Sequence, residues 1–433
     1  MSLLNRLGSD DTTVSSDVVN SFRQRLLAEA DLAELTSLSP GLRRVRLERM
    51  LAAILARDAR LMSSRQRATL TRQVVDEALG LGVLEPLLAD ETVTEIMING
   101  PHEIYVERGG RIEQVAARFT STEQLYQTID RIVAGVNRRV DESSPMVDAR
   151  LSGGERVNVI VPPLALNGPV VTIRRFPTHY TMEQLIELGT FDELTRDLLE
   201  CFVRARLNIV ISGGTGTGKT TMLNALSTAL PYHERIVTVE DSAELKLKQP
   251  HVIRLEARPP NTEGAGQVTI RDLMRNCLRM RPDRIIVGEV RGEETLDMLQ
   301  AMNTGHEGSL ATVHANSADD TVVRLETLAS MGDVRVPADT LRDQINSAVD
   351  IVVQLSRGAD GGRRISEIST LTSRRSNEYR LASLTSLRGD DRISSRLSVP
   401  HLPEKLARRI TFAGEPLPDG VVVDDHVDER GVG

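Results

Sequence analysis

The stretch Ile209-Val-Ile-Ser-Gly-Gly-Thr-Gly-Thr-Gly-Lys-Thr220 decides the fold expected for this chain. An apolar run ends at Ser212, and the pattern G-x-x-x-x-G-K-T follows it directly, as in a phosphate loop between a strand and a helix. Such a loop turns backbone N–H groups toward phosphates, and the following helix adds the positive end of its dipole. Lys219 would supply a compact cation, and the Thr220 hydroxyl would ligate Mg²⁺. The stretch therefore predicts an α/β domain that binds ATP with Mg²⁺. The other interpretation is a glycine-rich turn with a chance lysine. The residues expected to hold the nucleotide are Gly213, Gly214, Thr215, Gly216, Thr217, Gly218, Lys219, Thr220 and Thr221.

Strands and helices alternate with short connections on both sides of this loop, from residue 191 to about 385. This order is typical of a parallel sheet with helices on both faces. The apolar runs predict strands at 207–212, 235–240, 284–288, 310–313, 350–355, 363–371 and 379–383, with helices at 219–230, 270–281 and 296–303.

Two carboxylates follow strands of this predicted sheet. Glu240 ends the run Ile236-Val-Thr-Val-Glu240-Asp241, and Glu289 ends Arg284-Ile-Ile-Val-Gly-Glu289. Because the carboxyl ends of parallel strands share one crevice, we expect both acids to approach the phosphates. There they could polarise the attacking water or hold Mg²⁺ through water. Taken singly, each could also be a solvated loop acid.

A third predicted strand is bracketed by two of the eight histidines, His306 and His314. We expect the segment 304–316 to reach the same edge of the sheet, where a histidine could donate to phosphate or relay its presence. A structural hydrogen bond is the alternative for either ring.

The sequence before residue 191 indicates further parts. Residues 1–16 are expected to be a disordered lead, and 17–81 repeat apolar residues at helical spacing, which predicts a helical bundle. Period-two runs from 82 to 176, around a helix at 121–137, predict an α+β lobe, and 177–190 reads as a linker. At the other end, 386–433 is rich in Ser, Arg, Pro and acidic residues and is expected to be a disordered tail. The strands expected in the lobe cover residues 94–99, 103–107, 111–115, 146–151, 156–161 and 170–176.

Composition excludes several classes of protein. The 433 residues exceed one compact core, and a net charge of −8 with 3% aromatic residues disfavours a protein that coats nucleic acid. The two cysteines lack metal-ligand spacing, and no apolar run reaches the length of a membrane span. We therefore expect a cytoplasmic protein without direct membrane insertion and without a nucleic-acid partner.

Four motifs in order resemble those of the secretion ATPase superfamily, which powers type II and type IV secretion and type IV pili. They are the phosphate loop at 213–220, the acidic box at 238–241, the segment 278–291 that ends in Gly288-Glu289-Val-Arg291, and the histidine box at 304–316. The resemblance continues upstream at 93–100, 148–151, 156–163 and 171–176, so that it covers about residues 80–385.

The resemblance implies a homo-hexameric ring of two-lobed subunits, with a sensory-type (PAS-like) α+β lobe before a RecA-like motor lobe. By motif position, Glu289 corresponds to the catalytic glutamate, Glu240 to a second acid near Mg²⁺, and His306 and His314 to the histidine-box pair. Arginines of the N-terminal lobe would reach the γ-phosphate like arginine fingers, although a charged strand face is the other interpretation. The candidates are Arg150, Arg156 and Arg174.

The leader at 17–81, together with the predicted strand pair at 350–355 and 363–371, most resembles the ATPases of the tight-adherence (Flp) pilus and their archaeal-like relatives. The chain cannot build the tetracysteine site typical of type II secretion and type IV pilus assembly ATPases, and retraction ATPases lack a comparable helical leader. We thus expect a ring that works on an inner-membrane platform protein and is peripheral to the membrane through such partners. The alternatives are a conjugative type IV secretion ATPase and a nucleotide-switched docking scaffold; a DNA-translocating ATPase fits the charge poorly.

Overall fold

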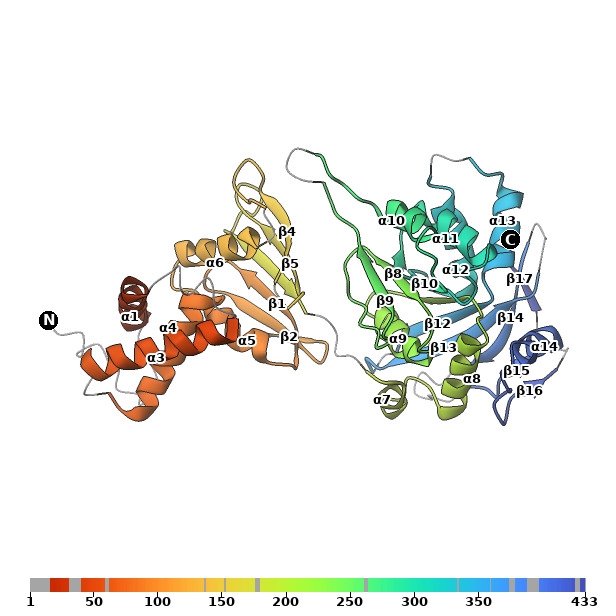
Figure 1. Cartoon of the computed structure of the whole chain (residues 1–433), viewed down its shortest axis with the longest axis horizontal. Helices are drawn as coiled ribbons and strands as arrows, with labels where there is room; N and C mark the ends of the chain where they lie inside the picture. The colour runs from red at the N-terminus through yellow and green to blue at the C-terminus, as the bar shows by residue number, and fades with distance from the viewer. Residues whose placement is uncertain are drawn as a thin grey trace. The chain divides into compact units, whose positions relative to one another are not determined.

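The computed structural model describes two compact units, Met1–Phe176 and Pro177–Gly433 (Figure 1). The division falls at the end of the lobe expected from the sequence, and each unit is described by itself. The expected lead 1–16 lies outside the described residues except for Ser16. The described residues are 16–30, 40–58, 62–135, 138–151, 153–175, 180–260, 264–332, 335–358, 360–373, 378–387, 397–424 and 429–432.

Unit 1 begins with a helical leader, as the apolar spacing predicts. Its helices are α1 (Ser16–Glu29), α3 (Pro40–Asp58) and α4 (Ser64–Leu79). They bury an apolar cluster of their own, which includes Phe22, Leu51 and Leu70. Ser63 begins α4 with a capping box, in which its side chain accepts from the backbone of Gln66 and the Gln66 side chain accepts in return. The leader is therefore a small packed bundle.

The rest of unit 1 is an antiparallel sheet with one long helix. The strand order is β3-β2-β1-β6-β5-β4, and the predicted helix is α6. Alternate residues of the strands face α6 and exclude water with it, because successive strand side chains point to opposite faces. The elements are η2 (Gly82–Leu84), α5 (Glu85–Ala89), β1 (Val93–Asn99), β2 (Ile104–Arg108), β3 (Arg111–Gln114), α6 (Thr122–Ala134), β4 (Met146–Arg150), β5 (Arg156–Ile160) and β6 (Val170–Arg174).

Unit 2 is built on a nine-stranded sheet in the order β17-β14-β13-β12-β7-β11-β10-β8-β9. The strands from β12 to β9 are parallel to one another, whereas β13, β14 and β17 are antiparallel additions at one side. The strands are β7 (Ile209–Gly213), β8 (Ile236–Glu240), β9 (Val252–Glu256), β10 (Arg284–Val290), β11 (Leu310–Val313), β12 (Ile351–Arg357), β13 (Arg363–Leu371), β14 (Tyr379–Ser386) and β17 (Glu429–Val432).

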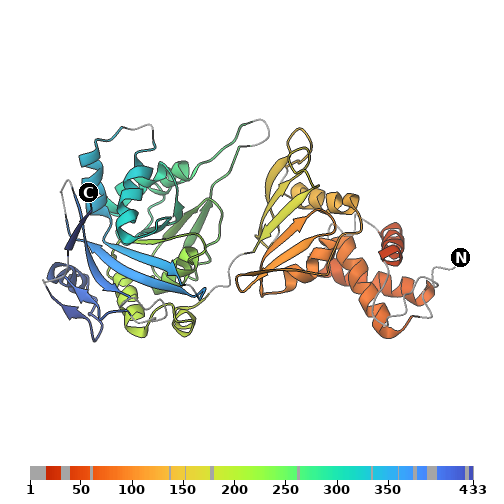
Figure 2. The same ribbon diagram turned by 180° about the vertical axis from the view of Figure 1, so that it is seen from behind.

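Helices cover both faces of this sheet, which confirms the layers predicted from the alternating pattern (Figures 1 and 2). One core joins α8 and α9 to residues such as Ile209 and Ile211, and the other joins α10 to α13 to residues such as Val210. The covering elements are α7 (Met182–Glu187), α8 (Glu193–Arg204), α9 (Lys219–Leu226), η3 (Ser227–Ala229), α10 (Ile270–Cys277), α11 (Glu294–Asn303), α12 (Ala318–Ala329) and α13 (Ala338–Ala348).

The expectation of a disordered tail is wrong for residues 397–424. They form β15 (His401–Leu402), α14 (Glu404–Phe412) and β16 (Val422–Val423), and β17 follows as part of the main sheet. Leu402, Leu406 and Ile410 enter the core of unit 2, and Arg409 forms an ion pair with Asp350, with Nη2 3.0 Å from Oδ2. Packing thus orders a segment whose composition suggested disorder.

Both cysteines are buried and unbonded to each other. Burial raises the pKa of the Cys201 thiol to about 11 and that of Cys277 to about 12. None of the helices in the described part of the chain has both the length and the apolar character needed to cross a membrane.

Candidate functional site

The phosphate loop connects β7 to α9, where the sequence pattern predicts it. Gly218 directly precedes α9 as its N-cap at a φ of +94°, a backbone conformation that favours glycine. A Cβ on Gly213 would lie 2.5 Å from Thr217 Oγ1 and 2.8 Å from the Leu355 carbonyl oxygen. The loop backbone therefore runs too close to its neighbours for a larger residue at its first position. Thr217 Oγ1 donates to the Gly214 carbonyl at 2.9 Å and closes the turn.

The ammonium of Lys219 lies against the loop that precedes it. Its Nζ donates to the carbonyl oxygens of Gly213 at 2.9 Å and Gly214 at 3.1 Å. Burial lowers the pKa of Lys219, and the charge of Glu289 offsets part of this effect. Thr220 is half-buried in the first turn of α9, whereas the side chain of Thr221 is buried in the unit. The loop thus presents the Lys219 ammonium and the Thr220 hydroxyl near a helix N-terminus.

Glu240 lies beside the strand that carries Glu289, because β8 and β10 are parallel neighbours. A Cβ on Gly288 would stand 2.9 Å from the Cγ of Glu240, so glycine makes the room that this side chain fills. Both acids lie at the carboxyl ends of parallel strands, on the side where the loop follows β7, and the charge of Glu289 contributes to the pKa values of Lys219 and His314. The structure therefore places Glu289 at the edge of the sheet where the phosphate loop lies.

Glu240 is only 2% exposed. Its Oε2 accepts from the backbone N–H groups of Glu244 at 2.7 Å and Leu245 at 2.9 Å, whereas Oε1 is buried without a hydrogen-bond partner. Burial raises the pKa of this carboxyl, and the two backbone bonds oppose the rise. A buried orphan oxygen of this kind is suited to a cation or a water at the site.

We expect Glu240→Gln to stabilise the fold more at pH 8 than at pH 4. The native pKa of Glu240 is raised above its ordinary 4.5, so the folded state binds more protons than the unfolded state. The free energy of unfolding therefore falls as the pH rises from the ordinary pKa through the raised one. The glutamine oxygen can keep both backbone bonds without the buried charge. Melting temperatures from pH 4 to 8 check this, with exposed Glu307→Gln as the control. A gain that does not grow with pH would contradict the role assigned to burial.

The two histidines lie at opposite ends of β11. His314 follows the strand and reaches the loop, with Nδ1 3.4 Å from Lys219 Nζ and Nε2 3.5 Å from Thr215 Oγ1. Burial and the charge of Lys219 lower the pKa of the His314 imidazole below its usual 6.5, so it can accept a hydrogen bond at pH 7. The prediction for this residue is supported by its position.

The expectation that His306 reaches the same edge is wrong within unit 2. It precedes β11, which runs parallel to β7, so it lies toward the start of both strands, whereas the loop follows their ends. Its neighbour Gly308 donates its N–H to Asn208, the residue just before β7. The segment 304–316 runs from one end of the parallel strands to the other. The sequence pattern did not show that the two histidines lie at opposite ends.

The three candidate arginines of unit 1 form one row across its sheet. Arg150 is in register with Arg156, and Arg156 with Arg174. Their strand neighbours face the core of the unit, so the arginines lie on the opposite face. Arg174 also lies 3.6 Å from Glu95 in an exposed ion pair. The row concentrates positive charge, and its role toward a nucleotide stays a prediction.

The sequence pattern did not assign a role to Arg291, which contacts the predicted catalytic acid. Its Nε and Nη2 donate to Glu289 Oε2 at 3.0 and 2.6 Å. The spacing of Glu289 and Arg291 could have indicated this contact, since residues two apart in a strand project from the same face. The oxygens of Thr220, Glu240 and Glu289 are the ligand type that Mg²⁺ prefers. The site residues therefore fit a magnesium nucleotide.

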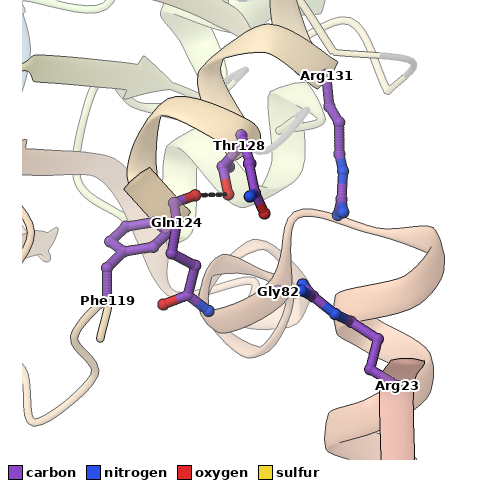
Figure 3. A pocket seen from close by; sticks show the side chains of 7 residues that line it. Arg23, Gly82, Phe119, Gln124, Thr128 and Arg131 are labelled. Atoms are coloured by element: carbon purple, nitrogen blue, oxygen red, sulfur yellow. Dashed lines mark hydrogen bonds between the residues drawn. The ribbon is translucent and has the colours of Figure 1, made fainter. Parts of the chain in front are cut away.

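Hollows in the described residues also lie away from the phosphate loop, and one of about 420 Å³ is lined by side chains of α14 and by Val423. No three His, Cys, Asp or Glu side chains there gather in a group that could hold a metal ion. A pocket in unit 1 has a volume of about 10 Å³, room for a single water at most (Figure 3). Its lining residues are Arg23, Gly82, Phe119, Gln124, Gln127, Thr128 and Arg131.

Comparison with known proteins matches both units. A family model described as Type II/IV secretion system protein matches residues 77–391. A putative conjugal transfer protein of Mycobacterium tuberculosis is 37% identical over 337 residues, which cover 76% of this chain and 94% of the relative. The conjugal transfer protein TrbB of Rhizobium radiobacter is 32% identical over 313 residues, which cover 71% of this chain and 92% of the relative.

Among solved structures, the pilus retraction motor PilT with bound ADP is similar in fold. The match has a TM-score of 0.51 at 20% identity, and it covers 76% of this chain and 88% of the PilT chain. The likeness confirms the predicted fold class, an N-terminal α+β domain followed by a RecA-like motor domain. The family model begins at residue 77, so α1, α3 and most of α4 precede the matched part.

Proposed function

Because this chain belongs to the type II/IV secretion system protein family, we propose that it is a ring-forming ATPase whose hydrolysis of ATP drives a secretion or pilus machine. The observation that carries the proposal is that the phosphate loop and Glu289 lie at the same edge of the sheet, because β7 and β10 both run parallel to β11 between them. A loop alone would support nucleotide binding, whereas a carboxylate beside it supports hydrolysis.

In this proposal each residue of the site has its own role in ATP hydrolysis. The loop backbone and Lys219 bind the phosphates, and Thr220 and Glu240 supply oxygens for the magnesium that accompanies ATP. Mg²⁺, when bound, neutralises charge that develops on the phosphates. Glu289 accepts a proton from the attacking water through its carboxylate. His314, neutral at pH 7, responds to the position of Lys219. Arg150, Arg156 and Arg174 stabilise charge on the γ-phosphate in this proposal.

Two features support tight-adherence (Flp) pilus assembly as the machine. A packed helical leader precedes the part matched by the family model, and the chain has two cysteines where a tetracysteine site needs four. In this account a homo-hexamer acts on an inner-membrane platform protein and stays at the cytoplasmic face through that partner.

A conjugative type IV secretion system is the second candidate. The names of the relatives favour it, because two of them are described as conjugal transfer proteins. The leader supports the first candidate instead, because most of it precedes the part that the family model matches.

Purification of the full chain from its own cells in mild detergent tests the proposal. We expect inner-membrane platform proteins of a pilus system to copurify, and a soluble fragment of that partner to stimulate steady ATP turnover. Components of a conjugation channel in their place would favour the second candidate. A partner that binds according to bound nucleotide, without changing turnover, would indicate a switched scaffold and contradict the motor.

A further inference from the structure

One guanidinium joins the ends of two strands at the proposed hydrolytic site. The Nε and Nη2 atoms of Arg291 both donate to the same oxygen of Glu289, Oε2, and Nη1 lies 3.7 Å from Asp241 Oδ2. Asp241 directly follows β8, and Glu289 lies near the end of β10. No hydrogen bond within the described residues engages Glu289 Oε1. The contact therefore fixes one oxygen and leaves the other open to a further partner.

The backbone that carries Arg291 is itself held in place. The N–H groups of Arg291 and Gly292 donate to Glu294 Oε1 at 2.6 and 2.9 Å. Glu294 is only 6% exposed, at the start of α11. A buried carboxylate thus anchors the turn, so that the Arg291 side chain starts from a defined position.

Stability does not explain the pair between Arg291 and Glu289. The side chains of Arg291 and Glu289 are 57% and 25% exposed, and solvent-exposed ion pairs contribute little to folding stability. Burial opposes a rise in the pKa of Arg291, but its bond to Glu289 and the charges of Glu289, Asp241 and Glu244 raise it overall. The guanidinium, which stays protonated in proteins, therefore interacts with the charges of three carboxylates.

We propose that Arg291 is a positioning residue for hydrolysis, which holds the Glu289 carboxylate so that Oε1 can accept a proton from the attacking water. The inference rests on the proposed function, because it assigns a role through Glu289. A fork that gives two N–H groups to one oxygen restricts the carboxylate more than a point charge would. Misplacing a catalytic group by about 1 Å is enough to lower a rate by roughly 100-fold.

The test compares Arg291→Ala and Arg291→Lys in the full chain, with ATP affinity and kcat measured separately. We expect Arg291→Ala to lower kcat by about 10- to 100-fold with the Kd for ATP changed by less than about twofold. Arg291→Lys keeps the charge but loses the planar guanidinium, so its kcat should lie between that of the wild type and that of Arg291→Ala. Arg408→Ala, which removes another exposed arginine from an ion pair on unit 2, is the control.

A double-mutant cycle separates positioning from a structural role. In a Glu289→Gln background, adding Arg291→Ala should change the residual single-turnover rate by less than about twofold, because the group it positions is gone. An unchanged or increased kcat in Arg291→Ala would overturn the inference, as would a loss of ATP affinity in both Arg291 variants. If Glu289→Gln itself keeps wild-type turnover, the proposed function fails, whatever Arg291 does.

Discussion

Glu289→Gln is expected to lower kcat by about 100- to 10,000-fold while ATP still binds, because the amide cannot accept a proton from water. The substitution keeps the size of the side chain and one oxygen for Arg291, so the strand end should stay intact. Phosphate release under saturating ATP gives kcat, and equilibrium binding of a fluorescent ATP analogue gives affinity. The expected result is an enzyme that retains nucleotide without turning it over.

The control for Glu289→Gln is Glu307→Gln. Glu307 is an exposed acid near the opposite end of the sheet, so neither kcat nor affinity should change. Wild-type turnover in Glu289→Gln would show that Glu289 is not the general base. Loss of ATP affinity in the same variant would show that Glu289 acts in binding.

Lys219→Ala is expected to weaken ATP binding by about 100-fold or more and to abolish measurable hydrolysis. Charge-assisted hydrogen bonds to phosphate contribute about 1.5–3 kcal/mol each, and a factor of ten in Kd corresponds to about 1.4 kcal/mol. The ammonium already lies within hydrogen-bond distance of the loop carbonyls, so its loss leaves no cation in that position. Equilibrium binding of the labelled analogue measures the change.

Two further variants test whether the effect is specific to the Lys219 ammonium: the conservative Lys219→Arg and the control Lys248→Ala. A planar guanidinium is larger than an ammonium and directional, so Lys219→Arg should recover only part of the affinity. Lys248 is exposed, and Lys248→Ala should bind as the wild type does. Binding by Lys219→Ala within a few-fold of wild type would contradict the assignment of the loop.

The strands could be predicted closely where side chains alternate or where an apolar run ends in a motif. The predicted strand at 310–313 has the bounds of β11, and the runs that end near Ser212 and Glu240 became β7 and β8. Convergence of Glu240 and Glu289 followed from parallel pairing alone, because neighbouring carboxyl ends share one edge. Local pattern was sufficient for these features.

Other features depend on contacts that are distant in the sequence. The helix α14 has a polar composition, but it is ordered by burying Ile410 against unit 2 and by pairing Arg409 with Asp350. The position of His306 depends on which end of β11 it precedes, and Arg291 gained a role only when its contact with Glu289 was seen. Composition and motif spacing do not report such pairings.

Steady-state phosphate release from ATP and Mg²⁺ by the purified full chain is the most direct test of the central claim. The account predicts continuous turnover by the wild type that exceeds the Glu289→Gln rate by about 100-fold or more. Equal, background-level release by the two proteins, with ATP bound to both, would contradict a hydrolytic motor.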